Sequence, residues 1–182
     1  MIFSPLPLKG AYIINLDKKE DKRGFFARFY CKKEFKKQGL NTNLVQMNTT
    51  LSRKKGTIRG LHFQRPKKSE AKVVRCLRGA IWDVIVDIQV NSPTYGEWYG
   101  TELNDENRTM MYLPKGFAHG FQTLVDNVEL LYLHSEFYSA EHEGGLLYND
   151  VMVDIDWPLP VSEISERDML HPYLNQLEPI EL

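Results

Sequence analysis

Short strand-like segments separated by turn residues fill most of the chain, and this spacing is the strongest constraint on its fold. Runs rich in apolar and β-branched residues recur at 10–16, 44–52, 57–64, 72–79, 80–89, 97–103, 109–114 and 127–135. Turn signals lie between them, as in NSPTYG at 91–96 and PKG at 114–116. Helical patterns are limited to 31–40 and 165–172. The sequence therefore predicts an all-β sandwich or barrel with a short helical C-terminal tail.

Composition narrows the class of protein further. The 182 residues are 42% hydrophobic and 26% charged with a net charge of −1, which fits one domain over 1–182. Near-neutral charge argues against a nucleic-acid binder. The apolar run AIWDVIVDI is too short to span a membrane, and MIFSPLPLKG lacks the features of a secretion signal. Cys31 and Cys76 match no metal or redox spacing, so we expect reduced thiols in a cytoplasmic protein.

Strand alternation directs several polar side chains inward. Tyr132 and His134 share a face with Val128, and a tyrosine and a histidine in a core both need polar partners. Lys72 shares a face with Val74 and is expected to point inward at the start of its strand.

The segment TIRGLHFQRP at 57–66 places a single histidine in an apolar run. His62 alone is compatible with a structural ring, a metal ligand or a proton-transferring base. Arg59 and Lys72 bring cations to the same neighbourhood, which suits either a solvated face or an anionic substrate. Arg59 and His62 would lie on opposite faces of a regular strand. A bulge at Gly60 would bring both to one cavity.

The segment PKGFAHGF resembles the second motif of the cupin superfamily, through Pro114, Gly116 and His119. Metal-binding cupins usually carry a His-x-His pair in their first motif, whereas the matching place here reads HFQ at 62–64. Phenylalanine cannot ligate a metal, and a glutamine amide is a poor substitute for imidazole. The metal set is incomplete, so we expect no metal.

A longer series of motifs is more specific than any one of them. RGFF, VQMN, IRGLHFQ, KVVRCLRGAIWDVIVDIQVNSPTYGEW, LPKGFAHGF, LLY, FYSAEHEGGLLYND and IDWP occur in one order. From about Pro7 to Leu170 the chain resembles the dTDP-4-dehydrorhamnose 3,5-epimerase family. The resemblance implies a cupin-type, metal-free jelly roll, usually a homodimer, without an organic cofactor. It further implies inversion of carbons beside the 4-keto group of a nucleotide-linked 6-deoxyhexose, in rhamnose-like deoxysugar and O-antigen biosynthesis.

The resemblance also assigns roles to four catalytic residues. His62 would be the base that removes the proton beside the ketone, and Tyr132 the acid that returns one from the opposite face. Lys72 would stand near the ketone oxygen as it gains charge. Asp168 would hold the ring of His62, as a carboxylate does in hydrolase triads. Ser165 and Asp168 also form a capping-box-like pattern, so a role at a helix start stays open for Asp168.

A second group of residues matches the family's nucleotide and pocket contacts. These are Arg23, Phe26, Gln46, Asn48, Arg59 and Tyr138, with His119 in the pocket or against phosphate. Arg23 and Phe26 would come from a partner subunit through an exchanged N-terminal segment of about residues 1–50. The alternatives are that Phe26 is a core residue and that Arg23 lies in an ordinary turn.

Two departures from the family pattern concern specificity. Arg28 stands where the family commonly has a glutamate that contributes to base recognition, so cytidine- and guanosine-linked sugars remain possible beside dTDP-sugars. Leu133 and His134 follow Tyr132 where the family usually places a lysine directly after it.

The sequence does not decide whether carbon 3, carbon 5 or both are inverted. Two other classes also stay open, namely a metal-dependent cupin isomerase or oxygenase and a non-catalytic sugar-nucleotide binding module.

Overall fold

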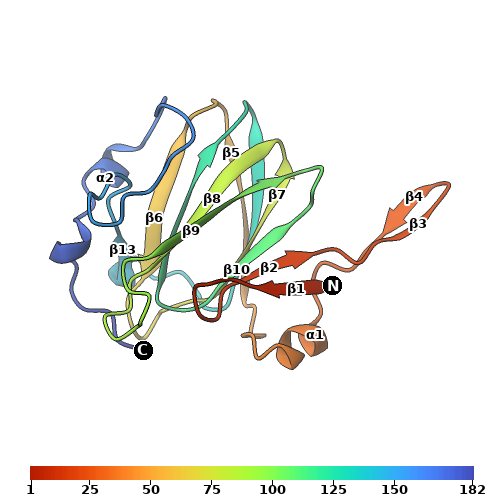
Figure 1. The fold of residues 1–182 in the computed structure, drawn as a ribbon, viewed down its shortest axis with the longest axis horizontal. Helices are drawn as coiled ribbons and strands as arrows, with labels where there is room; N and C mark the ends of the chain where they lie inside the picture. Colours follow the sequence, from red (N-terminus) through yellow and green to blue (C-terminus); the bar gives the residue numbers. More distant parts are fainter.

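A computed structural model describes all 182 residues and shows two stacked β-sheets (Figure 1). The larger sheet has the strand order β1 (Ile2–Pro5), β2 (Tyr12–Asn15), β10 (Met110–Leu113), β7 (Lys72–Arg78), β12 (Val128–His134), β5 (Gln46–Ser52). The smaller sheet has the order β13 (Glu143–Gly145), β6 (Ile58–Gln64), β11 (Phe117–Thr123), β8 (Ala80–Asp87), β9 (Trp98–Asn104). All strand pairs within both sheets are antiparallel. The predicted all-β, cupin-type jelly-roll sandwich is confirmed.

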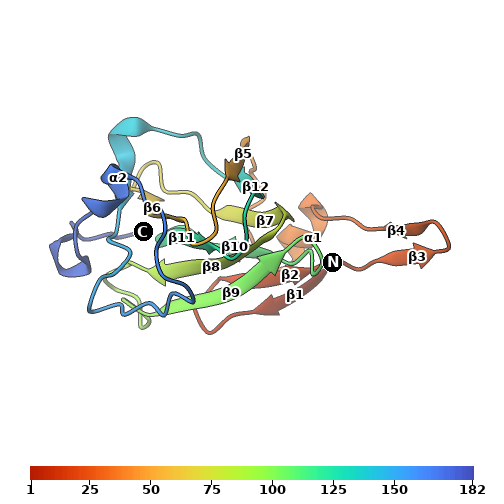
Figure 2. The ribbon, with the colours of Figure 1, turned by 90° about the horizontal axis from the view of Figure 1, so that it is seen from above.

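The remaining elements lie outside the two sheets. They are the hairpin β3 (Lys19–Asp21) and β4 (Gly24–Phe26), the helices α1 (Lys32–Lys37) and α2 (Glu166–Met169), and the 3₁₀ turns η1 (Ala140–His142) and η2 (Leu174–Gln176). Figures 1 and 2 both show the β3–β4 hairpin projecting from one end of the sandwich, with α2 at the opposite end. No helix combines the length and apolar character needed to cross a bilayer. Cys31 and Cys76 form no disulfide.

Three apolar clusters follow from strand alternation. The cluster between the sheets contains Ile81 and Ile85 of β8, with Tyr132 packed against it. The next residues along β8, Val84 and Val86, belong to a second cluster that the C-terminal tail helps to form. A third cluster on the larger sheet is built around Phe35 of α1, which explains why this short basic helix forms. Each sheet therefore carries an apolar cluster on both of its faces.

All eight predicted strands are confirmed, but β11 was not predicted as a strand. All seven residues of β11 are buried, so the segment lacks the alternation of apolar and polar residues that marks a half-exposed strand. The strands β1, β3, β4 and β13 were also missed, and each has only three or four residues.

The predicted bulge at Gly60 is confirmed. His62 pairs with His119 and Arg59 with Phe121, so two residues of β6 oppose Gly120 alone. Leu61 packs in the cluster on the outer face of the smaller sheet, and the extra residue turns Arg59 to the same inner cavity as His62. Gly60 adopts a φ of 120°, and a Cβ there would lie 2.6 Å from the Gly120 Cα. Only glycine fits this close approach of two strands.

Replacing Gly60 tests this account, with Gly24 as a matched control. Gly24 has a similar φ of 127°, but no atom of another element lies within 4 Å of the place where a Cβ would stand. We expect Gly60→Ala to lower the free energy of unfolding by about 3 kcal/mol or more, because backbone strain and overpacking add. Gly24→Ala carries the backbone strain alone and should cost about 1–2 kcal/mol. Urea unfolding measures both values, and equal losses would contradict the close-approach explanation.

Candidate active site

A cavity of about 190 Å³ opens between the two sheets. Residues from both sheets line it: Asn48, Thr50, Arg59, His62, Lys72, His119, Phe121, Tyr132, His134. Six of these were predicted from the sequence as site residues. A wider cleft of about 840 Å³ shares Arg59 and His62 with this cavity and extends to Asp168 and the tail. The sandwich thus brings distant predicted residues to one place.

His62 is held by a carboxylate from the tail. Its Nε2 lies 2.8 Å from Oδ1 of Asp168, and the Gly60 amide donates to Oδ2 of the same carboxylate at 3.0 Å. An ionised carboxylate only accepts hydrogen bonds, so His62 carries its hydrogen on Nε2. Nδ1 has no hydrogen-bond partner in the chain. This leaves an unprotonated ring nitrogen available to take a proton.

The alternative that the Asp168 carboxylate caps a helix start is wrong, because Ser165 is the cap. The backbone amide of Asp168 donates to the Ser165 hydroxyl at 3.1 Å, which caps the start of α2. Its side chain is turned away from the cap, toward Gly60 and His62. Burial alone would raise the pKa of Asp168, but contacts from His171, His62 and the Gly60 amide hold that pKa well below its usual range. The carboxylate stays ionised beside the ring.

A cationic side chain and a second histidine flank this pair. Nη2 of Arg167 lies 3.3 Å from Nε2 of His62, while its Nη1 donates to Glu143 at 3.0 Å. Nε2 of His171 lies 3.5 Å from Oδ1 of Asp168. The ligand atoms of His62, Asp168 and His171 lie within 4.8 Å of one another, a spacing that a metal ion can bridge. The neighbouring guanidinium opposes a further cation there by charge repulsion.

Tyr132 faces the same cavity from the larger sheet. Burial, assisted by the negative charge of Asp83, raises the pKa of its phenol. The hydroxyl therefore keeps its proton at neutral pH and suits a proton donor. Because His62 belongs to β6 and Tyr132 to β12, the two groups approach the cavity from different sheets.

His119 has a carboxylate partner of its own. Its Nε2 lies 2.7 Å from Oδ1 of the fully buried Asp83, and its ring contacts that of Tyr132 edge-on at 6.1 Å between centroids. Asp83 was not predicted as a site residue. Its charge on a strand facing the core was the available signal, since a buried carboxylate needs a partner.

The inward position predicted for Lys72 is confirmed. Its side chain is 10% exposed, and Nζ lies 3.1 Å from Oε1 of Glu70. His134 also binds Glu70, through Nδ1 at 2.7 Å. Glu70, His134, His171 and Arg167 all lie at or beside the site without having been predicted there. For His134, the shared face with Tyr132 was the available signal.

The predicted nucleotide contacts divide into two groups. Gln46 lies beside the cavity because its amide donates to Asn48 at 3.3 Å and its Oε1 accepts from the Tyr138 backbone at 3.2 Å. The Tyr138 hydroxyl donates to Glu143 at 3.1 Å. Arg59 lines the cavity and reaches the Leu51 carbonyl at 3.4 Å.

Arg23, Phe26 and Arg28 do not reach the cavity of their own chain. Arg23 pairs with Asp21 at 2.6 Å, and Arg28 pairs with Glu34 at 3.0 Å. Phe26 is 75% exposed, so the expectation that it is a core residue is wrong. All three belong to the projecting hairpin or the chain just after it (Figure 1).

The fold and the site together define a class. A two-sheet cupin-type sandwich with a carboxylate-held histidine and a neutral phenol facing one cavity is suited to general acid–base catalysis. The profile of the dTDP-4-dehydrorhamnose 3,5-epimerase family matches residues 5–176. The chain therefore belongs to the dTDP-4-dehydrorhamnose 3,5-epimerase family and is an isomerase.

Individual relatives agree with this assignment. A dTDP-4-dehydrorhamnose 3,5-epimerase of Sinorhizobium fredii is 42% identical, over 97% of this chain and 91% of the relative. The crystal structure of such an enzyme from Elizabethkingia anophelis is 42% identical with a TM-score of 0.93, over 96% of this chain and 97% of that one. A Legionella pneumophila 3,5-epimerase, solved in complex with dTDP-4-keto-L-rhamnose, is 35% identical with a TM-score of 0.91, over 97% and 94%.

Because the pKa of Asp168 is lowered in the folded protein, the contribution of this carboxylate to stability should depend on pH. A lowered folded-state pKa adds stability above the unfolded-state value of about 4, and this stability is lost as the pH falls further. We expect Asp168→Asn to lower the free energy of unfolding by about 1–3 kcal/mol at pH 7. The difference in free energy of unfolding between the wild type and the variant should become smaller below pH ~4. Urea unfolding at pH 7 and pH ~3 tests this, and a gap that widens in acid would contradict it.

Proposed function

We propose that this chain epimerises carbons 3 and 5 of a dTDP-linked 4-keto-6-deoxyhexose, with His62 as the base and Tyr132 as the acid. The observation that carries the proposal is the free Nδ1 of His62, whose Nε2 is anchored by Asp168 in the cavity that Tyr132 also lines. Removal of the proton beside the ketone converts His62 to its charged form. The ionised carboxylate of Asp168 stabilises that charge.

Inversion requires that the proton return to the other face of the sugar ring. A ring bound between the sheets has His62 on one side and Tyr132 on the other, and the raised pKa of Tyr132 keeps its proton available. Lys72 stands on the wall of the same cavity, where an ammonium stabilises negative charge developing on the ketone oxygen. His119 and Asn48 complete the wall, and Arg59 supplies a permanent cation for the diphosphate.

The dTDP-linked sugar is favoured over cytidine- and guanosine-linked sugars by the family and by the ligand of the Legionella relative. Arg28 replaces the expected glutamate, but its charge is balanced within the chain by Glu34. Deoxysugar biosynthesis of the rhamnose type is the pathway class that consumes such a product.

Proton exchange in deuterated water tests the reaction directly. We expect the wild-type protein to place deuterium at carbons 3 and 5 of the dTDP-linked 4-keto sugar, with lower kcat/KM for the CDP- and GDP-linked sugars. His62→Ala should lower turnover by at least about 100-fold, because a general base is lost. Mass spectrometry and proton NMR locate the label.

Two results would overturn the proposal. A fully active His62→Ala variant would remove His62 as the base. Loss of activity after chelator treatment, restored by iron or zinc, would favour a metal-dependent enzyme using His62, Asp168 and His171. His142→Gln is a suitable control for the His62→Ala variant and should keep wild-type activity, since His142 binds Ser139 outside the cavity.

We also propose that the protein works as a homodimer in which the β3–β4 hairpin of one subunit completes the site of the other. The projecting hairpin, the exposed Phe26 and the distance of Arg23 from its own cavity support this arrangement (Figures 1 and 2). Aromatic and arginine side chains of this kind suit a nucleotide base and a phosphate.

Mixing two impaired variants tests the exchange. The His62→Ala subunit has an intact hairpin, and the Arg23→Ala subunit has an intact cavity. In a mixed dimer these two combine, so one of the two sites is intact. Random pairing on co-expression should restore about a quarter of wild-type sites if the dimer is two-fold symmetric. Activity no higher than that of the separate variants would show that the hairpin serves its own chain. Light scattering of each sample gives the mass of the assembly.

A further inference from the structure

Lys72 belongs to a buried cluster with two further ionisable side chains, to which the proposed reaction gives no role. Oε1 of Glu70 lies 3.1 Å from Nζ of Lys72, and Oε2 lies 2.7 Å from Nδ1 of His134. The three side chains are at most 12% exposed. Glu70 alone does not line the cavity, whereas Lys72 and His134 do. The carboxylate therefore acts on the site through its two neighbours.

Sheet register places Lys72 directly beside His134. Lys72 begins β7, His134 ends β12, and the two residues are paired directly across the strands. An ammonium and an imidazole facing each other in a buried position repel one another whenever the imidazole is charged. Glu70 lies two residues before the start of β7, and its two carboxylate oxygens reach Lys72 and His134. One carboxylate thus holds both nitrogen-bearing side chains.

The charge state of Glu70 follows from its contacts. Burial would raise the pKa of Glu70, but the hydrogen bond from His134 and the charge of Lys72 lower it overall. An ionised carboxylate accepts only, so Nδ1 of His134 carries hydrogen. Nε2 of the ring is then free to accept from the Asn48 amide, 3.5 Å away, a contact at the long limit of hydrogen bonding.

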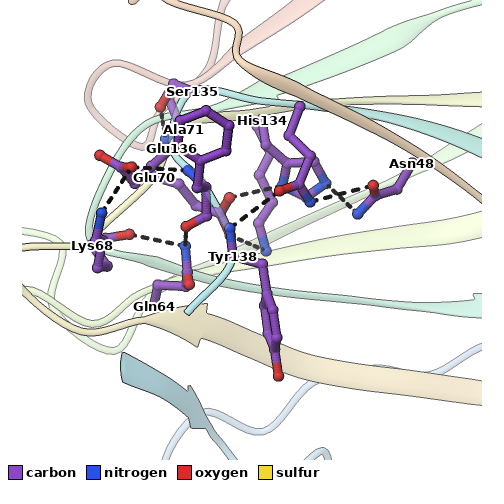
Figure 3. Close-up of polar contacts among 12 residues, drawn as sticks. Asn48, Gln64, Lys68, Glu70, Ala71, His134, Ser135, Glu136 and Tyr138 are labelled. Carbon is purple, nitrogen blue, oxygen red and sulfur yellow. Dashed lines mark hydrogen bonds and ion pairs between the residues drawn. The ribbon is translucent and has the colours of Figure 1, made fainter. Parts of the chain in front are cut away.

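The cluster continues toward the predicted nucleotide contacts. Figure 3 shows His134 and Asn48 joined by a dashed line, with Glu70 and the backbone of Tyr138 in the same network. Asn48 accepts from Gln46, which in turn accepts from the Tyr138 amide. A chain of contacts therefore links Lys72 to the residues proposed to hold the nucleotide.

We propose that Glu70 and His134 are positioning residues that fix the Lys72 ammonium for stabilisation of the enolate oxygen, an inference that rests on the proposed function. Lysine carries its charge on a flexible four-carbon stem, and an ammonium stabilises a transition state only where it is already in place. Glu70 takes one of its three donors and restricts the stem. His134 fixes the second oxygen of Glu70 and so prevents the carboxylate from turning away.

Glu70→Gln removes the charge while keeping the size of the side chain. We expect kcat to fall by about tenfold or more with KM changed less than about threefold, because the loss concerns the transition state. The alkaline limb of the kcat profile should move to lower pH, since a buried ammonium without a counter-charge loses its proton more easily.

Two substitutions of His134 separate positioning from packing. Asparagine places an amide donor near the position of Nδ1, so His134→Asn should keep most of the wild-type kcat. His134→Phe keeps a ring without a donor and should resemble Glu70→Gln. Glu136→Gln is the matched control, because Glu136 forms a similar pair with Lys68 at 3.2 Å, outside the cavity (Figure 3). It should match the wild type in kcat and pH profile.

A measurement without substrate separates this inference from the proposed function. The Lys72 ammonium, buried and ion-paired, should give an observable proton–nitrogen NMR signal in the wild type and in His134→Asn, and lose it through fast exchange in Glu70→Gln. The inference is overturned if Glu70→Gln has the same kcat and the same pH profile as an active wild type. It is also overturned if the NMR signal of Lys72 is unaffected by this substitution. Both results leave the proposed function standing. A wild type that exchanges no sugar proton overturns the function, whatever the NMR signal shows.

Discussion

The close approach of Gly60 to Gly120 is the constraint on which the site depends. Without the extra residue of β6 at this point, Arg59 would point to the outer face with Leu61, away from His62. The same bulge presents the Gly60 amide to Asp168, which in turn orients His62. A single irregularity of the backbone therefore sets the direction of a proposed phosphate ligand and the tautomer of a proposed base.

Carboxylates orient the three histidines and the lysine that line the cavity. Asp168 binds His62, Asp83 binds His119, and Glu70 binds both Lys72 and His134. Each pairing compensates for the loss of hydration of a buried charge. Each pairing also decides which nitrogen of the histidine or lysine donates, because an ionised carboxylate only accepts hydrogen bonds. The cavity is in this way a set of preoriented donors and acceptors between two rigid sheets, which is the condition for electrostatic stabilisation of a developing enolate.

Local sequence patterns predicted most strands and several side-chain directions, but they did not predict contacts between residues that are distant in the sequence. Alternation identified most strands, the inward Lys72 and the face shared by Tyr132 and His134, and glycine chemistry identified the bulge. Alternation could not identify β11, because a strand buried on both faces shows none. The partners Asp83 and Glu70 were missed because they depend on which strands become neighbours. The contact between His62 and Asp168 spans 106 residues, and the motif series, rather than any local pattern, pointed to it.

The position of Asp168 has a consequence for how the protein matures during synthesis. Every strand of both sheets has been translated once the chain has reached Gly145, whereas the residue that orients His62 comes 23 positions later, in α2. A prematurely ended chain therefore lacks the residue that holds the base, and it also lacks the tail residues Leu174 and Ile180 that complete the second apolar cluster. Orientation of the base and burial of the outer face of the smaller sheet are thus both tied to translation of the tail.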